Sequence, residues 1–322
     1  MLPVLAVLLA AVCFGTTGTA QAFGPMDASA GSIGAARVLI GGGILGVIAL
    51  VSAGRSARST RAADQAGAHP AGVRPPRIRP RTRSWMLVLV AALGVVAYQP
   101  AFFAGTASNG VAIGTVVALG SAPIITGLLD WALHRRFPGT VWLVATLVAT
   151  VGVALISGVL GESGGIPVSL PGLLASVGAG ASYAVYTLAS KALLEHGWAP
   201  TVTMGAVFGG AAILSIPLLF ASDTRWLLTA EGLVMALWLG VVTTAAAYLL
   251  FGWGLARLPA ATVSTLTLAE PLTATLLGTL VLGEALSATA IGGLAVLALG
   301  LALLAVPKAL LLPRGKTAAA RR

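Results

Sequence analysis

An acid and a proline stand side by side inside one of the apolar runs of this sequence. Glu270 lies near the middle of residues 260–281, and Pro271 follows it directly. A carboxylate at the centre of a bilayer costs on the order of 3 kcal/mol, so it usually faces a cavity or a partner helix instead of lipid. Pro271 also removes the donor for a backbone carbonyl one turn earlier, and protein or water must satisfy that carbonyl. The pair therefore predicts a transport site at membrane depth.

Two chemical roles are open for Glu270. It could alternate between protonated and charged forms, and so bind a substrate amine or exchange protons against substrate. It could instead stay neutral and hydrogen-bond a neighbouring helix, which would hold a bend at Pro271. The polar residues before it favour a helix that lines a cavity, although Thr and Ser also bond to their own helix. These residues are Thr262, Ser264, Thr265 and Thr267.

Other polar side chains inside apolar runs are candidates for the same site. Gln99, beside Pro100, offers an amide. Arg37 lies about seven residues into the second run, where it either binds substrate or extends outward towards Asp27, and the outward position is preferred. Tyrosine hydroxyls inside the runs need partners, which a cavity or a carbonyl on a neighbouring helix would provide. These tyrosines are Tyr98, Tyr183, Tyr186 and Tyr248.

The composition excludes an ordinary soluble globular protein. Apolar residues make up 57% of the chain, charged residues 9%, and the mean hydropathy is +0.97, whereas about a quarter of a soluble domain is charged. Cys13 is the single cysteine, so neither an intrachain disulfide nor a cysteine metal site is predicted. The net charge of +10 comes from basic residues beside apolar runs, which favours a membrane protein and no nucleic-acid partner.

Ten apolar runs come close to the ~20 residues that a helix needs to cross ~30 Å of hydrocarbon. They predict an all-α integral membrane protein with transmembrane helices at residues 3–22, 30–53, 84–105, 109–130, 140–159, 171–193, 201–221, 231–253, 260–281 and 288–306. The first run also resembles a cleavable signal peptide, because it ends in an Ala-x-Ala at Ala20–Ala22. It has no basic residue before its apolar core, so a retained span is the preferred interpretation.

The positions of Lys and Arg predict the orientation. The segment 54–83 carries many arginines and a single acid, Asp64, so the positive-inside rule places it in the cytoplasm. With ten spans, every other Lys and Arg except Arg37 and Arg225 then falls on the cytoplasmic side as well. The prediction is a protein of the cell membrane with both N- and C-termini in the cytoplasm.

Two basic segments, 54–83 and the tail 308–322, lack apolar periodicity and are expected to be disordered. The arginines of 54–83 would contact anionic lipid head groups, at about 1 kcal/mol per basic residue near the surface, or they would only fix the topology. The second interpretation is preferred, since the positive-inside rule alone explains the cluster.

Two residue types predict how the helices pack and where they meet the membrane surface. Glycines four residues apart let backbones approach closely in lipid, as in Gly42–Gly46, Gly110–Gly114 and Gly205–Gly209. Tryptophans near the ends of runs are expected to anchor at the membrane interface. They are Trp85, Trp131, Trp142, Trp198 and Trp226.

The chain contains an internal repeat, in which residues 98–137 can be laid over 248–286. The aligned pairs are Tyr98 with Tyr248, Pro123 with Pro271 and, further on, Gly152 with Gly300. Each half then has five spans, and because five is odd the second half enters the membrane upside down. The prediction is two inverted five-helix repeats, 3–159 and 171–307, with a substrate site near the midplane at their interface.

The end of the chain resembles an EamA-type domain of the drug/metabolite transporter superfamily. The resemblance rests on Ala-Glu-Pro at 269–271, Leu-Gly-Glu at 282–284 and the glycines at 292, 293 and 300, with a weaker copy in the first half. Arg37 also resembles an Arg common at that place in the family. The resemblance implies a secondary transporter that moves a small metabolite, amino acid or drug-like compound by alternating access, without a cofactor, with export the preferred direction.

Two alternatives stay open: an uptake permease of the same family and, in a different class, an intramembrane enzyme acting on a lipid or isoprenoid substrate. The sequence has no H-E-x-x-H, no G-x-S-x-G and no Ser/His pair inside a run, so no catalytic or metal-binding residue is predicted. Gly-Lys-Thr at 315–317 lacks the first glycine of a P-loop, which argues against nucleotide-driven transport. The expected partners are a small-molecule substrate and membrane lipid, and the oligomeric state is not predicted.

Overall fold

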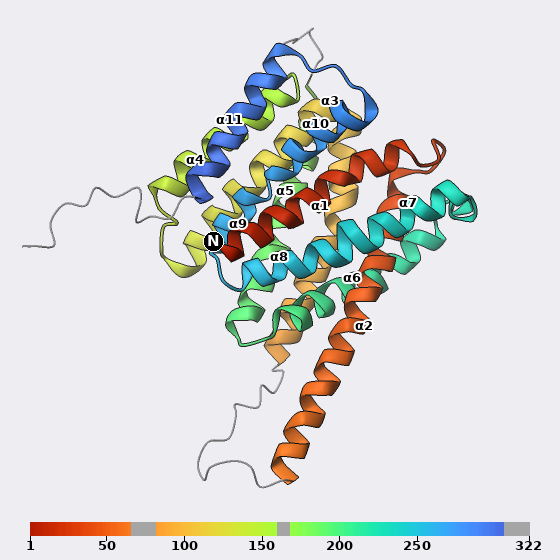
Figure 1. Cartoon of the computed structure of the whole chain (residues 1–322), viewed down its shortest axis with the longest axis vertical. Coiled ribbons are helices and arrows are strands. Elements are labelled where there is room, and N and C mark those ends of the chain that lie inside the picture. Colours follow the sequence, from red (N-terminus) through yellow and green to blue (C-terminus); the bar gives the residue numbers. More distant parts are fainter. Residues whose placement is uncertain (66–81, 160–167, 306–322) are drawn as a thin grey trace, which may run out of the picture.

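The structure is a computed structural model that describes residues 1–65, 82–159 and 168–305. Within these ranges all regular elements are helices, so the predicted all-α class is confirmed (Figure 1). They are α1 (Leu2–Ala22), α2 (Ala30–Gln65), α3 (Thr82–His134), α4 (Thr140–Ile156), α5 (Leu170–Glu195), α6 (Pro200–Phe220), η1 (Arg225–Leu228), α7 (Ala230–Gly240), η2 (Val241–Ala246), α8 (Ala247–Leu255), α9 (Ala260–Leu266), α10 (Ala269–Leu282) and α11 (Ala288–Ala305). By length and composition, 8 stretches of the described chain are able to cross a membrane, and α4 is slightly shorter at 17 residues.

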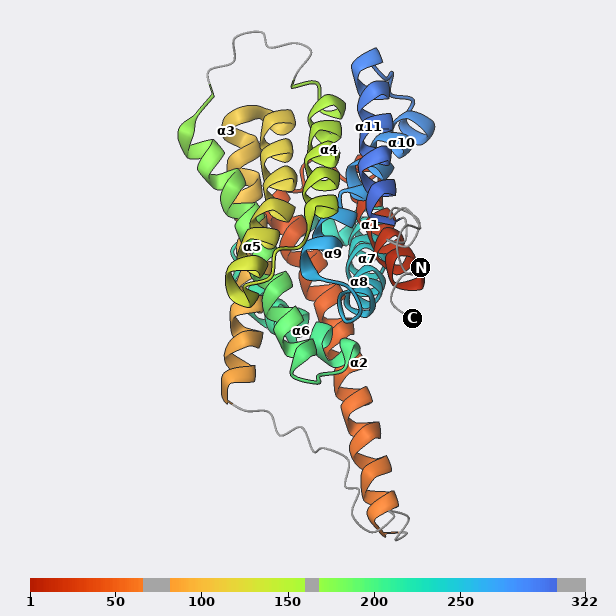
Figure 2. The ribbon, with the colours of Figure 1, turned by 90° about the vertical axis from the view of Figure 1, so that its left-hand side faces the viewer.

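The element α3 joins two of the predicted spans, 84–105 and 109–130, without a loop. Its chain reverses at Gly110, whose φ of 79° and ψ of 157° lie outside the helical region. This conformation favours glycine because it has no Cβ to clash with the backbone. Figure 2 shows the chain rising along a first leg (82–109) and returning along a second leg (111–134). The two predicted spans are therefore the two legs of one bent element.

The helix α2 extends well past the predicted end of its span at residue 53. Its 36 residues correspond to about 54 Å at 1.5 Å per residue, against ~30 Å of hydrocarbon, and Figure 2 shows the helix projecting beyond the rest of the bundle. The prediction of disorder is wrong for residues 54–65, which are rich in the strong helix formers Ala and Arg. The rest of the segment 54–83, up to residue 81, and the predicted basic tail 308–322 lie outside the described residues.

Two of the predicted spans are interrupted near their middles. The span 231–253 consists of α7, a π-helical turn (η2) and α8, in one continuous coil. The span 260–281 consists of α9 and α10, which are separated at Thr267 and Leu268. Interruptions at membrane depth are tolerated where the backbone is buried in protein or lines a cavity. They therefore direct attention to the interior between α8, α9 and α10.

Glycine allows the closest helix contacts, as predicted for Gly42–Gly46 and Gly205–Gly209, whereas Gly110 of the third predicted pair forms the reversal of α3. Between α2 and α6, a Cβ on Gly42 would collide with the backbone of Phe208, and a Cβ on Gly205 with the backbone of Leu45. Between α4 and α11, a Cβ added to Gly300 would lie 2.7 Å from the backbone nitrogen of Ala149. Backbones this close gain van der Waals contact that lipid cannot supply.

Like the α2–α6 and α4–α11 contacts, those of the first helix of each half cross between the two halves of the chain. The helix α1 packs against α8 and α10 of the second half. In return, α5 of the second half packs against both legs of α3, at Gly94 on the first leg and at Ala118 on the second. Each half thus places its first helix against the third and fourth helical segments of the other half.

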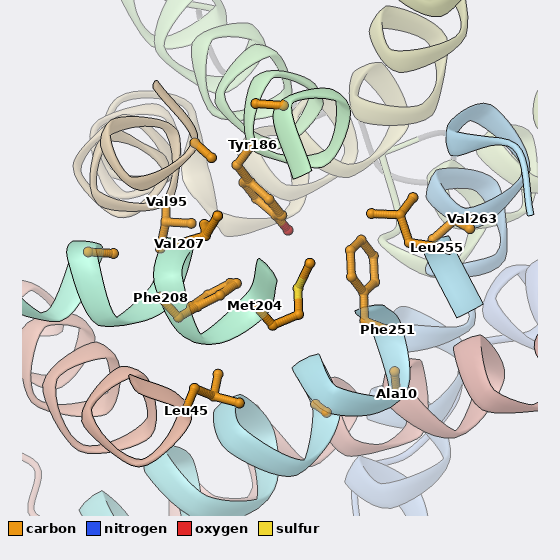
Figure 3. Packing of buried hydrophobic residues seen from close by; sticks show 14 of the residues in the cluster. Ala10, Leu45, Val95, Tyr186, Met204, Val207, Phe208, Phe251, Leu255 and Val263 are labelled. Carbon is orange, nitrogen blue, oxygen red and sulfur yellow. The ribbon is translucent and has the colours of Figure 1, made fainter. Parts of the chain in front are cut away.

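The largest apolar cluster lies where these helices converge. Met204 and Phe208 of α6 and Phe251 of α8 are at most 1% exposed, and they pack near Tyr186 of α5 (Figure 3). Burial of an aromatic or large aliphatic side chain contributes about 1.5–3 kcal/mol. This cluster positions the residues of the candidate site, because Tyr186 and Phe208 belong to both.

Two tryptophans expected at the membrane interface are instead buried. The Trp142 indole N–H of α4 lies 3.1 Å from both the Ala261 carbonyl and the Thr265 hydroxyl oxygen. The Trp226 indole N–H donates to the Ser32 hydroxyl at 2.7 Å. An indole N–H inside a bundle needs a partner, and both residues find one on a neighbouring helix. The anchor prediction is wrong for these two residues.

Candidate functional site

A cavity of about 90 Å³ lies among α1, α2, α3, α5, α6, η2, α8, α9 and α10. The structure brings together at this cavity every site residue predicted from the sequence except Pro271. Those that line it are Arg37, Tyr98, Gln99, Tyr183, Tyr186, Tyr248, Thr267 and Glu270. They come from both halves of the chain and are up to 233 residues apart in the sequence. Their grouping in space is a consequence of the helix packing described above.

Glu270 reaches the cavity from the first turn of α10, just after the interruption that separates α9 from α10. Pro271 has no N–H to donate to the Thr267 carbonyl, and the Glu270 N–H bonds that carbonyl instead, at 2.9 Å. The Leu268 N–H similarly bonds the Thr265 carbonyl at 3.1 Å, three residues back. The break therefore precedes Pro271, whereas one of the two roles left open for Glu270 assumed a bend at Pro271 itself.

The position of Glu270 also has an electrostatic consequence. The first turn of a helix presents unpaired N–H groups and a positive dipole end, which favour a negative charge. A carboxylate at the start of α10 is therefore partly stabilised by the helix that carries it. Discontinuous helices whose ends point at bound groups are a recurrent feature of transporter sites.

Thr267 and Tyr183 connect this break to α5. The Thr267 hydroxyl donates to the Ser264 carbonyl at 2.8 Å, which uses its one proton. Tyr183 must then be the donor in its 2.9 Å hydrogen bond with the Thr267 oxygen. The Tyr183 hydroxyl thereby holds the interrupted segment against α5.

The other tyrosines form an aromatic wall. The Tyr186 and Tyr248 hydroxyl oxygens are 3.2 Å apart and hydrogen-bonded. The Tyr248 ring lies against the rings of Phe208, with centroids 3.8 Å apart, and Phe14, with centroids 5.0 Å apart. Of the two surroundings predicted for the tyrosine hydroxyls, the cavity is the one observed for all four.

Arg37 lines the same cavity as Glu270. The preferred expectation, that it extends outward towards Asp27, is wrong, because neighbouring α2 residues such as Ala36 and Val38 are buried and turn this part of the helix inward. Its Nε is buried with no hydrogen-bond partner among the described residues. It also makes no ion pair within 4.0 Å with Glu270. Arg37 and Glu270 are the charged residues that line the cavity.

Some lining residues were not singled out from the sequence. They include Phe14, Phe208 and Thr244. Thr244 lies in the π-helical turn and donates to the Leu239 carbonyl at 2.9 Å, five residues back. Thr244 stands four residues before Tyr248, which places the two on one helix face, and that spacing is a signal that could have identified it. π-helical turns are often found at functional sites.

The arrangement offers groups that can recognise a solute. The Ser264 hydroxyl, like the Arg37 Nε, is buried without a hydrogen-bond partner among the described residues. Buried polar atoms are normally paired, so both groups are available to a solute in the cavity. A carboxylate, a guanidinium, hydroxyls and aromatic faces together suit a small molecule that carries charge and an apolar part.

Comparison with known proteins agrees with this description. The model of the EamA-like transporter family matches residues 1–158 and 170–306. The chain is 39% identical over 297 residues to the uncharacterized transporter YwfM of Bacillus subtilis (strain 168), covering 92% of this chain and 91% of that protein. A crystal structure of a protein with 20% sequence identity superposes with a TM-score of 0.72 over 94% of this chain and 98% of its own, which shows the shared fold.

Proposed function

Because the chain belongs to the EamA-like transporter family of multi-pass membrane proteins, we propose that it exports a small zwitterionic solute of the amino-acid type by alternating access. The observation that carries this proposal is that Arg37 and Glu270 share one cavity without closing on each other. A solute with a carboxylate for Arg37 and an ammonium for Glu270 satisfies both. The cavity volume of about 90 Å³ restricts the solute to a small one.

Each charged contact favours one part of such a solute. Arg37 presents a planar set of N–H donors that matches a carboxylate, and a hydrogen bond to a charged group contributes about 1.5–3 kcal/mol. An ammonium group beside Glu270 would also face the rings of Tyr98 and Tyr248, which attract cations. An amine alone would leave Arg37 unpaired, and a carboxylate alone would leave Glu270 unpaired.

The proposed architecture is two inverted five-helix repeats, 3–159 and 171–307. Three observations support it: the reciprocal packing of α1 and α5 on the opposite halves, the reversal of α3 at Gly110, and the two separate matches of the family model. Counting both legs of α3 as spans gives ten crossings. Both termini then lie in the cytoplasm of a cell-membrane protein, in agreement with the distribution of Lys and Arg.

The direction follows from competition at one carboxylate. If Glu270 binds either a proton or the substrate ammonium, then each change of access carries one of the two across and releases it on the far side, where the other binds for the return. Such exclusive binding gives exchange of protons against substrate. With a proton gradient directed inward, exchange drives the solute outward.

Counterflow into proteoliposomes tests the proposal. Vesicles loaded with an unlabelled amino acid should accumulate the labelled amino acid for at least one member of a panel, whereas protein-free vesicles should not. The matching amine and the matching carboxylic acid should each compete at least about tenfold more weakly, since each loses one charged contact. An intramembrane enzyme would instead convert a lipid substrate without solute flux.

The variant Arg37→Gln assigns the carboxylate contact. It should reduce the preference for the amino acid over its amine at least about tenfold, because Gln offers no positive charge. Amines that are transported as well as zwitterions by the unmodified protein would contradict the proposed substrate class and leave the transporter assignment intact.

A further inference from the structure

Lys191, near the end of α5, contacts the backbone where α8 ends and the connection to α9 begins. Its ammonium donates to the carbonyls of Leu255 and Leu258, each at 3.0 Å. Its side chain is only 15% exposed, and the nearest acid, Glu195, is 4.0 Å away. The same end of the bundle carries Arg257, and the positive-inside rule predicts that it faces the cytoplasm.

The helix α5 that carries Lys191 and the helices α8 and α9 that flank its acceptor carbonyls also line the cavity. Tyr186 of α5, Tyr248 of α8 and Ser264 of α9 border it. From Tyr248 towards the Lys191 contact, α8 contributes the side chains of Phe251 and Leu255, each 0% exposed. Figure 3 shows Phe251 and Leu255 beside Val263 of α9, which is also fully buried.

These observations describe a closed end of the pathway. An apolar layer fills the space between the cavity and the Lys191 contact, so a polar solute cannot leave in that direction unless α5 separates from α8 and α9. Separation would strip the ammonium of both carbonyls. Charge-assisted hydrogen bonds are stronger than neutral ones, so Lys191 adds to the stability of the closed arrangement.

We propose that Lys191 is a positioning residue that holds the cytoplasmic end of the transport pathway closed, and that its release accompanies opening to the cytoplasm. This inference rests on the proposed alternating access. It assigns a role to a residue outside the cavity and does not depend on the identity of the solute.

A simpler role would be to cap the end of α8, whose last carbonyls lack helical partners. Arg257 shows what such a local contact looks like, since its guanidinium donates to the Trp253 carbonyl at 2.8 Å and lies 3.9 Å from the Trp253 ring centroid, all within one segment. Lys191 instead crosses from α5 to another segment. Arg257 is therefore a matched control with the same charge at the same end of the bundle.

The test measures access to the cavity from each side of the membrane. A reporter cysteine replaces Leu119, which lines the cavity from the second leg of α3, in a Cys13→Ala background. A membrane-impermeant maleimide is then applied to right-side-out and inside-out membrane vesicles. Lys191→Met should raise the ratio of cytoplasmic to external labelling rates about fivefold or more by shifting the population towards the inward-open form.

The control variants make the result specific. Arg257→Met should leave the labelling ratio unchanged, and Lys191→Arg, which keeps charge and donors, should shift it less than Lys191→Met. If Lys191→Met does not fold, Lys191→Gln replaces it and should shift the ratio in the same direction, since a neutral amide donates weaker hydrogen bonds.

The two possible failures are distinguishable. An unchanged ratio in Lys191→Met and Lys191→Gln, with labelling otherwise normal, would overturn the role of Lys191 and leave alternating access standing. A ratio that moves towards external labelling would overturn the placement of this end. A reporter that labels from neither side in any variant would contradict alternating access at this cavity, and the inference would fall with it.

Discussion

The two proline-containing helices that border the cavity differ although their sequences align. In the first half, the second leg of α3 passes Pro123 without a break, and Ala122 before it lines the cavity. In the second half, the helix is interrupted just before Pro271, and Glu270 takes the place that Ala122 has in the first half. The two halves thus provide similar walls with different chemistry.

This difference shows how two halves with similar sequences place a single acid among the described residues that line the cavity. A proline alone does not break the helix, since α3 accommodates Pro123. In the second half the carbonyl freed by Pro271 is taken by the Glu270 N–H, and the Thr267 side chain is held by Ser264 and Tyr183. The positive charge at the cavity, Arg37, comes from the other half, so the movement of the halves that we propose would change the distance between the two charges.

Moving the acid from one half to the other should have the largest effect. Glu270→Ala should reduce transport at least about 100-fold, because the cavity then keeps Arg37 without an acid and loses both proton and ammonium binding. Adding Ala122→Glu should not restore it, since α3 lacks the interruption and the tyrosine contact. Efflux from whole cells and counterflow into proteoliposomes measure both variants, with membrane insertion as the control. Full rescue by Ala122→Glu would mean that the halves are interchangeable at this position.

Removing each proline in turn sharpens the same comparison. Pro271→Ala restores an N–H that competes for the Thr267 carbonyl, so α9 and α10 should tend to join and transport should fall about tenfold. Pro123→Ala should change transport less than about twofold, because its helix is already continuous. Initial rates in proteoliposomes provide the measurement. Equal losses for the two variants would show that the interruption is not the feature that matters.

A smaller effect is expected where the break is held against α5. Tyr183→Phe removes the hydrogen bond donated to Thr267 and keeps the ring, so transport should fall about fivefold, corresponding to a net hydrogen bond of ~1 kcal/mol. The thermal unfolding midpoint of the detergent-solubilised protein should change little. A transport rate equal to that of the unmodified protein would show that the hydrogen bond from Tyr183 to Thr267 does not contribute to transport.

The sequence predicted the helices better than it predicted the segments that join or extend them. Apolar length alone placed nearly every helix, because a bilayer fixes the length of a span. The two spans 84–105 and 109–130 imply a reversal between them, but its location at Gly110 was not predicted, because two adjacent apolar runs look alike whether a loop or a single glycine joins them. The helical extension to Gln65 was missed because an arginine-rich composition is compatible with both a helix and a disordered chain.

The sequence selected the residues that line the candidate cavity, but it did not predict the directions in which the Arg37 and Trp142 side chains point. Polar residues inside apolar runs are few, so Glu270 and the tyrosines could be selected from the free-energy cost of placing polar groups in a bilayer. The inward direction of Arg37 depends on the packing of α2 against α6, and the burial of Trp142 depends on a partner 123 residues away. Such long-range contacts leave no periodic signal in a single sequence.

The most direct test of the account measures proton movement during transport. Proteoliposomes that contain a pH-sensitive dye and the transported amino acid are compared for the unmodified protein, Glu270→Gln and Glu284→Gln. Glu284 is a matched control, since it follows the same helix and is exposed. The account predicts that efflux of the solute drives protons in the opposite direction for the unmodified protein and for Glu284→Gln. Glu270→Gln should insert normally and move no protons. Solute efflux and proton movement at unmodified rates in Glu270→Gln, from about pH 5.5 to about pH 8, would contradict the central role of Glu270.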